Sequence, residues 1–151
     1  MPPIVVGPHS LDEWVRYRCR RTLFQLSSPR RDRRGVGPVR LPDRFVQRVV
    51  VLNPHSVAAS PTLIQIIDRR ACRGLEETRY LDSSQRVYCP GEVEDDFLLI
   101  DDDCVVRLLH DDHGRLVLGV VQTGGMLDRY RLVRDLVWEA AVPSDWSRDL
   151  N

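Results

Sequence analysis

FLLIDDDCVVRLLHDDHGRLVLGVVQ, residues 97–122, decides the fold of this chain. The stretch contains three runs of strand-type residues: FLLID (97–101), CVVRLLH (104–110) and RLVLGVVQ (115–122). The second turn, HDDHGRL, brackets two aspartates with two histidines, a pattern also found in metal and acid/base sites. Residues 111–114 (Asp-Asp-His-Gly) fit a type I turn that ends in glycine, and side chains at such a tip splay apart. We therefore predict a hairpin and no metal site.

The segment before this stretch predicts a different unit. RVVVLN, residues 48–53, is a short β-branched run, which is typical of a strand buried on both faces. Ser60-Pro61 indicates the start of a helix that ends at Gly74, and TRYL (78–81) indicates the next strand. A strand, a helix and a strand in this order predict a βαβ unit whose two strands are parallel.

Helices are expected at both ends of the chain. SLDEW begins with Ser10 and has Glu13 three residues later, a capping-box pattern that predicts a helix from about Leu11 to Thr22. A helical period of apolar residues predicts a last helix over residues 126–141, which Pro143 ends.

The fold class is therefore α/β (α+β): a small mixed sheet with a βαβ unit, a C-terminal hairpin and packed N- and C-terminal helices. We expect a single domain over residues 1–151. Residues 1–9 are expected to be an irregular lead-in, and the Arg/Pro/Gly-rich residues 27–43 a loop or linker.

Composition excludes several kinds of chemistry. All 22 basic residues are arginine, because the sequence contains no lysine. Schiff-base chemistry on lysine, a Walker phosphate-binding lysine and a kinase-type lysine are therefore excluded. The four cysteines form no CxxC pair, so reduced thiols and no cofactor are expected. The N-terminus does not resemble a signal peptide and no apolar run is long enough to span a bilayer, so we expect a cytoplasmic protein without membrane contact.

Charge is unevenly distributed along the chain. Residues 1–48 contain eleven Arg and four Asp/Glu, a balance of +7, whereas residues 49–151 contain eleven Arg and eighteen Asp/Glu, a balance of −7. The basic segment predicts either an acidic or phosphate-bearing partner or an arm that folds back on the chain's own acidic part. The candidate phosphate- or nucleic-acid-binding residues are Arg30, Arg31, Arg33 and Arg34.

Polar side chains follow both strands of the predicted βαβ unit. Because ligands bind beyond the carboxyl ends of parallel strands, these loops predict a site for a small polar ligand, or acid/base work by a histidine. The candidate catalytic residues are His55, Asp82, Asp101 and His110. The candidate ligand-binding residues are Asn53, Ser56, Ser83 and Arg107. The aspartates at 94–96 and 101–103 fit solvated turns better than a cation site, since their spacing is not that of a calcium loop.

The last part of the chain also resembles an uncharacterised family of small actinobacterial proteins. The matching positions are Phe97, Leu99, Asp101, Asp102, Asp111, Gly114, Arg134, Asp135, Trp138, Ala141 and Pro143, together with the opening WVRYRCRRTLFQL. The middle departs from the family, because NPHSVAASPTLIQ replaces its Glu-Pro-x-x-x-Tyr stretch. The resemblance implies genes beside helix-turn-helix regulators and no established activity. The element order is similar to half of a phospholipase D-like fold without its His-x-Lys motif, which implies a binding shell.

Three functions stay open. The first is a non-catalytic regulatory module that binds a small polar ligand or a partner protein, with a homodimer as one option. The second is a small acid/base enzyme, such as a cyclase, isomerase or hydrolase, that uses His55 or His110 with Asp82 or Asp101. The third is a nucleic-acid-associated protein that binds through its Arg-rich segment.

Overall fold

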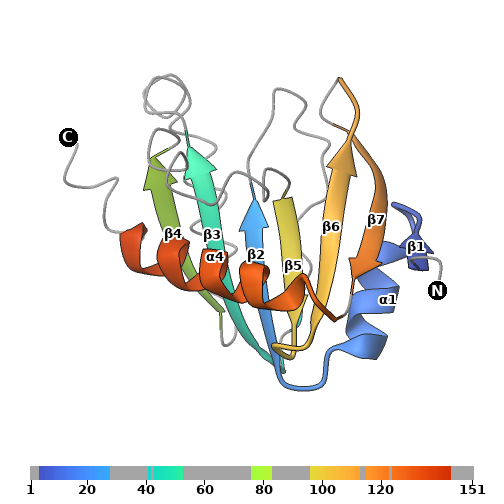
Figure 1. The fold of residues 1–151 in the computed structure, drawn as a ribbon, viewed down its shortest axis with the longest axis horizontal. Coiled ribbons are helices and arrows are strands. Elements are labelled where there is room, and N and C mark those ends of the chain that lie inside the picture. Colours follow the sequence, from blue (N-terminus) through green and yellow to red (C-terminus); the bar gives the residue numbers. More distant parts are fainter. Residues whose placement is uncertain are drawn as a thin grey trace.

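The computed structural model describes residues 4–27, 41, 43–52, 76–82, 96–112, 115–122 and 124–143. The described elements are β1 (Ile4–Val6), α1 (Leu11–Arg18), β2 (Thr22–Ser27), β3 (Phe45–Leu52), β4 (Glu76–Asp82), β5 (Asp96–Ile100), β6 (Cys104–His110), β7 (Leu116–Gln122), α4 (Leu127–Ala140) and β8 (Val142–Pro143). The strands form one sheet in the order β1-β7-β6-β5-β2-β3-β4-β8 (Figure 1). The predicted mixed α/β class is confirmed.

The sheet is mixed, and its parallel pairs are adjacent to each other. β2, β3 and β4 are mutually parallel, and every other neighbouring pair is antiparallel. The parallel pairing of β3 and β4 is the pairing expected of the predicted βαβ unit. The predicted helix after Ser60 lies outside the described residues. Consequently β2, β3, β4 and β6 all end at one edge of the sheet, which is the upper edge in Figure 1.

Each face of the sheet packs against one helix. Leu11 and Val15 of α1 pack on one face, while Tyr130, Val133 and Val137 of α4 pack on the other. Because successive strand residues point to opposite faces, Leu23 belongs to the α1 core and its neighbour Phe24 to the α4 core. In Figure 1, α4 crosses in front of the middle of the sheet.

The predicted hairpin between residues 104 and 122 is confirmed. β6 and β7 are antiparallel, with an irregular register between Leu109 and His110 that is typical of a bulge. At the tip, the backbone nitrogen of Asp111 donates to the carbonyl oxygen of Arg115 (2.9 Å), and the backbone nitrogen of Arg115 donates to the Asp111 carboxylate (2.9 Å). His113 and Gly114 lie outside the described residues.

Three boundaries differ from the sequence prediction. The first helix begins at Leu11 as predicted but ends at Arg18, and residues from Thr22 onward form β2 instead of a helical turn. Ser10 is the residue that precedes the helix, as predicted, but its side chain makes no capping hydrogen bond, so the predicted capping box does not form. The lead-in contains β1, which pairs with β7, and Pro143 belongs to the short strand β8. Tertiary pairing with β7, β3, β5 and β4 stabilises these strands, and periodicity within a short segment does not reveal it.

Neither of the two described helices is long and apolar enough to cross a membrane.

Candidate functional site

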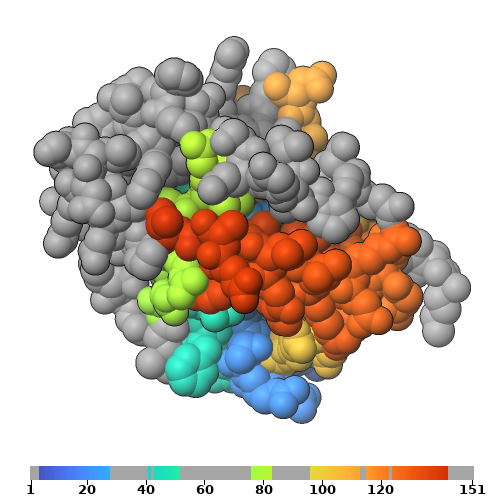
Figure 2. All heavy atoms as spheres, turned by 60° about the vertical axis from the view of Figure 1, so that its left-hand side comes forward, coloured from blue at the N-terminus to red at the C-terminus, as the bar shows by residue number. Residues whose placement is uncertain are grey.

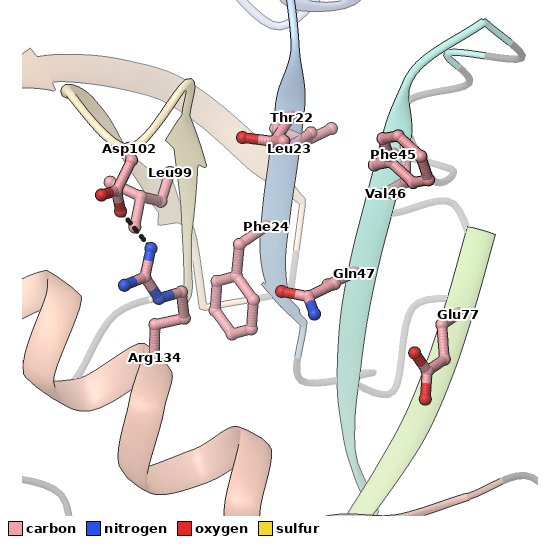
Figure 3. Close-up of a pocket in the computed structure, with 10 residues that line it drawn as sticks. All are labelled: Thr22, Leu23, Phe24, Phe45, Val46, Gln47, Glu77, Leu99, Asp102 and Arg134. Atoms are coloured by element: carbon pink, nitrogen blue, oxygen red, sulfur yellow. Dashed lines mark hydrogen bonds and ion pairs between the residues drawn. The ribbon is translucent and has the colours of Figure 1, made fainter. Parts of the chain in front are cut away.

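A groove lies between α4 and the first residues of the three parallel strands. Its volume is about 410 Å³. It is lined by Thr22, Leu23, Phe24, Phe45, Val46, Gln47, Glu77, Leu99, Asp102 and Arg134 (Figure 3). These strand residues begin β2, β3 and β4, so the groove lies at the sheet edge opposite to the one where the sequence predicted a ligand site.

The side chains that line the groove are determined by the alternation of strand residues between the two faces of the sheet. Phe24 and Leu99 belong to the core that α4 covers, and Phe45 and Gln47 point to the same face of the sheet because they alternate with the buried Val46. Phe45 stays 63% exposed, which is unusual for a phenylalanine in a sheet. The result is an apolar floor with an aromatic ring open to solvent.

At one end of the groove, two arginines of α4 bind the turn that contains Asp102. Arg134 on α4 forms an ion pair with the Asp102 carboxylate, and its Nε donates to Asp135 at 3.0 Å (Figure 3). Nε of Arg131 donates to the Asp102 carbonyl oxygen at 2.9 Å. Burial alone would lower the pKa of Arg134, but its bonds to Asp102 and Asp135 raise that pKa above the usual value. Arg134 is therefore charged at neutral pH, and its charge is compensated by the carboxylates of Asp102 and Asp135.

A second arginine holds the other end of α4 on the sheet. Arg79 of β4 lies over the ring of Trp138, 4.0 Å from its centroid, and donates to the Trp138 carbonyl oxygen at 2.9 Å. The same guanidinium pairs with Glu77 at 3.3 Å. The charge of Glu77, the carboxylate that lines the groove at this end, is thus compensated by Arg79.

Two polar side chains of the groove have no such partner. Among the described residues, neither the amide of Gln47 nor the hydroxyl of Thr22 makes a side-chain hydrogen bond. In Figure 3 the Gln47 amide points from β3 toward the ring of Phe24, between Arg134 on one side and Glu77 on the other. An amide offers both donors and an acceptor, so Gln47 is the group best suited to orient a ligand here.

Asp101, a predicted catalytic residue, has a structural role. Its Oδ1 accepts the backbone N–H groups of Arg21 (2.7 Å) and Thr22 (3.0 Å), and its Oδ2 accepts that of Arg20 (3.0 Å). Burial alone would raise the pKa of Asp101, but these three bonds hold it below its usual value. A buried carboxylate that is fully ionised and fully bonded is a poor proton acceptor.

The turn that presents Asp101 is built for this role. Asp101 and Asp102 have φ values of 52° and 63°, and the backbone nitrogen of Asp103 donates to the Ile100 carbonyl at 3.1 Å. Aspartate is one of the few residues that tolerate this left-handed conformation. The same turn thus supplies Asp101 to the end of α1 and Asp102 to α4. Burial also raises the pKa of the neighbouring Cys19 thiol to about 11, with the Asp101 charge acting in the same direction.

The remaining described candidates do not meet one another. Asp101 precedes β6 and His110 ends it, so they lie at opposite edges of the sheet, roughly 20 Å apart. Asp82 ends β4 at the same edge as His110, but four strand spacings separate β4 from β6, or about 19 Å. Arg107 lies within β6, in register with Phe97 and Val120, and does not line the groove.

The other predicted site residues lie outside the described residues: Asn53, His55, Ser56, Ser83, Arg30, Arg31, Arg33 and Arg34. No group of three or more metal-ligating side chains occurs within the ranges that the structure does describe.

A buried polar row on the α1 face is not predicted from the sequence. Arg48 is 5% exposed and lies in register with Gln25 on β2 and Thr78 on β4. Its Nε donates to the Gln25 side-chain oxygen at 3.1 Å, and its Nη1 pairs with Glu76. One feature of the sequence could have indicated this row: the polar pair Gln47-Arg48 interrupts the otherwise apolar run FVQRVVVL. Gln47 points to the groove and Arg48 to this row.

Comparison with known proteins identifies the fold and the family. A similar solved structure is that of TrmBL2, an archaeal chromatin protein described as showing a novel mode of DNA binding. The identity is 18%, the TM-score is 0.50, and the match covers 95% of this chain and 54% of that one. The chain thus spans about half the length of TrmBL2, and the likeness concerns the fold alone.

No curated protein matches this chain. The model of a family described as a domain of unknown function, DUF6879, matches residues 11–146. The resemblance to an uncharacterised family is thereby confirmed at the level of the family. Because the match covers most of the sequence, the chain belongs to the DUF6879 family.

Proposed function

We propose that this domain is a non-catalytic binding module that acts in regulation, and that its ligand occupies the groove between α4 and β2–β4. The ligand is a small, flat, uncharged molecule with an amide-like hydrogen-bonding edge. The observation that carries this proposal is the amide of Gln47, which makes no hydrogen bond among the described residues and points toward the Phe24 ring, two residues from the exposed Phe45.

The size and lining of the groove support a small ligand. Ligand sites are typically concave spaces of roughly 300–1,000 Å³ with apolar walls and a few polar groups that fix orientation. A volume of about 410 Å³, with Phe24, Phe45 and Leu99 as its apolar part, falls in this class. Aromatic side chains also favour flat partners, which stack on their faces.

The charges support an uncharged ligand. Both carboxylates of the groove are paired with arginines, Asp102 with Arg134 and Glu77 with Arg79. A charged ligand would have to displace one of these partners and would leave the other charge exposed to the apolar floor. Hydrogen bonding to Gln47 has no such cost.

The chemistry of the lining favours binding over catalysis. The described lining contains no histidine, cysteine or serine that would act as a nucleophile or general base. Of the described acid/base candidates, His110 is roughly 20 Å from both Asp82 and Asp101, far beyond hydrogen-bond reach. The expected likeness of the element order to half of a phospholipase D-like fold without its catalytic motif, and the expected cytoplasmic location, would both be compatible with this role.

The test uses benzamide, a flat molecule with a carboxamide edge. We expect its addition to ¹⁵N-labelled protein to shift the backbone amides of Thr22, Gln47 and Glu77 and the side-chain amide of Gln47. The charged analogues benzoate and benzamidine should bind at least about fivefold more weakly, since the groove offers no free counter-charge. Shifts that map to the opposite edge of the sheet, or equal binding of all three compounds, would argue against the proposal.

A second candidate is association with nucleic acid through the Arg-rich segment. The balance of +7 in residues 1–48 supports it, and the fold it shares with a chromatin protein that binds DNA is compatible with it. Counterion release predicts that retention on heparin falls steeply with salt. Replacement of Arg30, Arg31, Arg33 and Arg34 by Gln should then abolish retention, and unchanged retention would exclude this function.

A further inference from the structure

The outer face of α4 carries exposed leucines. Tyr130, Val133 and Val137 attach the helix to the sheet, whereas Leu132 is 51% exposed and Leu136 is 43% exposed. The two leucines are one helical turn apart, so they lie side by side at the centre of the solvent-facing side. In Figure 2 this helix, coloured orange to red, forms a continuous ridge on the surface. The two leucines form a small apolar patch that no described element covers.

Charged residues extend the leucine pair in both directions. Arg129 lies one turn before Leu132, and Glu139 lies one turn after Leu136; both are exposed. The spacing from Arg129 through Leu132 and Leu136 to Glu139 is three, four and three residues, which is that of the a and d positions of a coiled coil. The stripe therefore reads basic, apolar, apolar, acidic along the helix.

We propose that this stripe is a homodimer interface in which α4 packs antiparallel against α4 of a second copy. A twofold axis at the level of Arg134 places Leu132 against the partner's Leu136. The same axis places Arg129 against the partner's Glu139. An isologous contact repeats each pair, so the interface has two leucine contacts at its centre and one ion pair at each end.

Charge selects the antiparallel orientation. A parallel pair would place Arg129 against the partner's Arg129 and Glu139 against the partner's Glu139, which is repulsive at both ends. Asp135 on the flank is drawn toward Arg134 by a 3.0 Å hydrogen bond, so its charge is compensated within its own chain. Arg134 itself points to the groove, on the other side of the helix, so ligand binding and self-association use separate surfaces.

The test is sedimentation equilibrium of the full chain from roughly 10 µM to 1 mM, a range suited to a small interface. The weight-average mass of the wild type should rise from 17.4 kDa toward twice that value. Leu132→Ser/Leu136→Ser should stay monomeric. Circular dichroism should show an unchanged fold, because both side chains are exposed.

Charge reversal tests the pairing itself. Arg129→Glu and Glu139→Arg should each weaken the dimer at least about tenfold, and the double reversal should restore it, because the ion pairs re-form with exchanged signs. Arg115→Glu and Asp112→Arg make the same charge changes at exposed positions of the β6–β7 hairpin and should leave the dimer unchanged. A wild type that is monomeric throughout, a dimer that survives both serines, or a double reversal without rescue would each overturn the proposal.

Discussion

Oδ1 of Asp101 lies 2.7 Å from the backbone nitrogen of Arg21, a residue eighty positions earlier in the chain. The same carboxylate accepts the backbone nitrogens of Arg20 and Thr22. These bonds fix the point where the chain leaves α1 and enters β2. The turn between β5 and β6 therefore sets the position of the strand that begins the groove.

Replacement of Asp101 should destabilise the whole domain. Asp101→Asn removes one acceptor oxygen and turns an amide group toward the backbone donors, so we expect a loss of about 2–3 kcal/mol in the free energy of unfolding. The matched control is Asp103→Asn, whose exposed pair with Arg18 should be worth less than about 1 kcal/mol. Urea unfolding measures both, and equal effects of the two variants would show that Asp101 does not anchor the turn.

The same residue predicts a pH dependence of stability. Its folded-state pKa is lowered from the usual 3.8, so its contribution is complete above that value and is lost as the pH falls through the folded-state pKa. The stability advantage of the wild type over Asp101→Asn should be constant between about pH 5 and 7 and should shrink below about pH 4. Urea midpoints of both proteins between pH 7 and 3 test this. An advantage that grows on acidification would mean that the pKa is raised.

Gly119 predicts a packing cost in the sheet. A Cβ at this position would lie 2.9 Å from Cγ1 of Val106 and 3.4 Å from Cδ1 of Leu11, so Gly119→Ala should cost about 1–3 kcal/mol through overpacking. Gly125 has no atom within 4 Å of its Cβ position, so Gly125→Ala is the control and should be nearly neutral. Thermal unfolding distinguishes them. A neutral Gly119→Ala would place α1 further from β7.

The buried ion pair of Arg48 and Glu76 should show strong coupling. Removal of one partner leaves a charge in the interior, so Arg48→Met and Glu76→Leu should each cost about 3–5 kcal/mol. The double variant leaves no such charge and should cost clearly less than the sum of the two. A double-mutant cycle in urea measures the coupling, and strictly additive costs would show that the two side chains act independently.

The sequence predicts those parts of the fold that local pattern determines. The hairpin at residues 104–122, the last helix and the parallel pair β3–β4 follow from strand-type runs, turn residues and helical period. β2 is missed because TLFQLS directly follows a helical pattern, and only its two neighbours, β3 and β5, show it to be a strand. β1 is too short to have a period of its own.

The candidate site is predicted less well, for a physical reason. The polar residues that follow the parallel strands predict a site at the upper edge of the sheet. The groove instead forms at the lower edge, where α4 does not cover the first residues of β2 and β3. Figure 2 shows parts of these strands, in blue and teal, below the helix. The path of a helix across a sheet depends on tertiary contacts, such as Arg79 with Trp138 and Arg134 with Asp102, that span many residues of sequence.

Benzamide affinity of Gln47→Leu tests the central claim most directly. Leucine keeps the apolar volume of the side chain but removes its hydrogen bonds, so the variant should bind benzamide at least about tenfold more weakly than the wild type. Gln122→Leu makes the same change on β7, outside the groove lining, and should bind as the wild type does. If Gln47→Leu binds benzamide as tightly as the wild type, while the groove residues still shift on titration, Gln47 does not orient the ligand and the claim that its amide selects the ligand is contradicted.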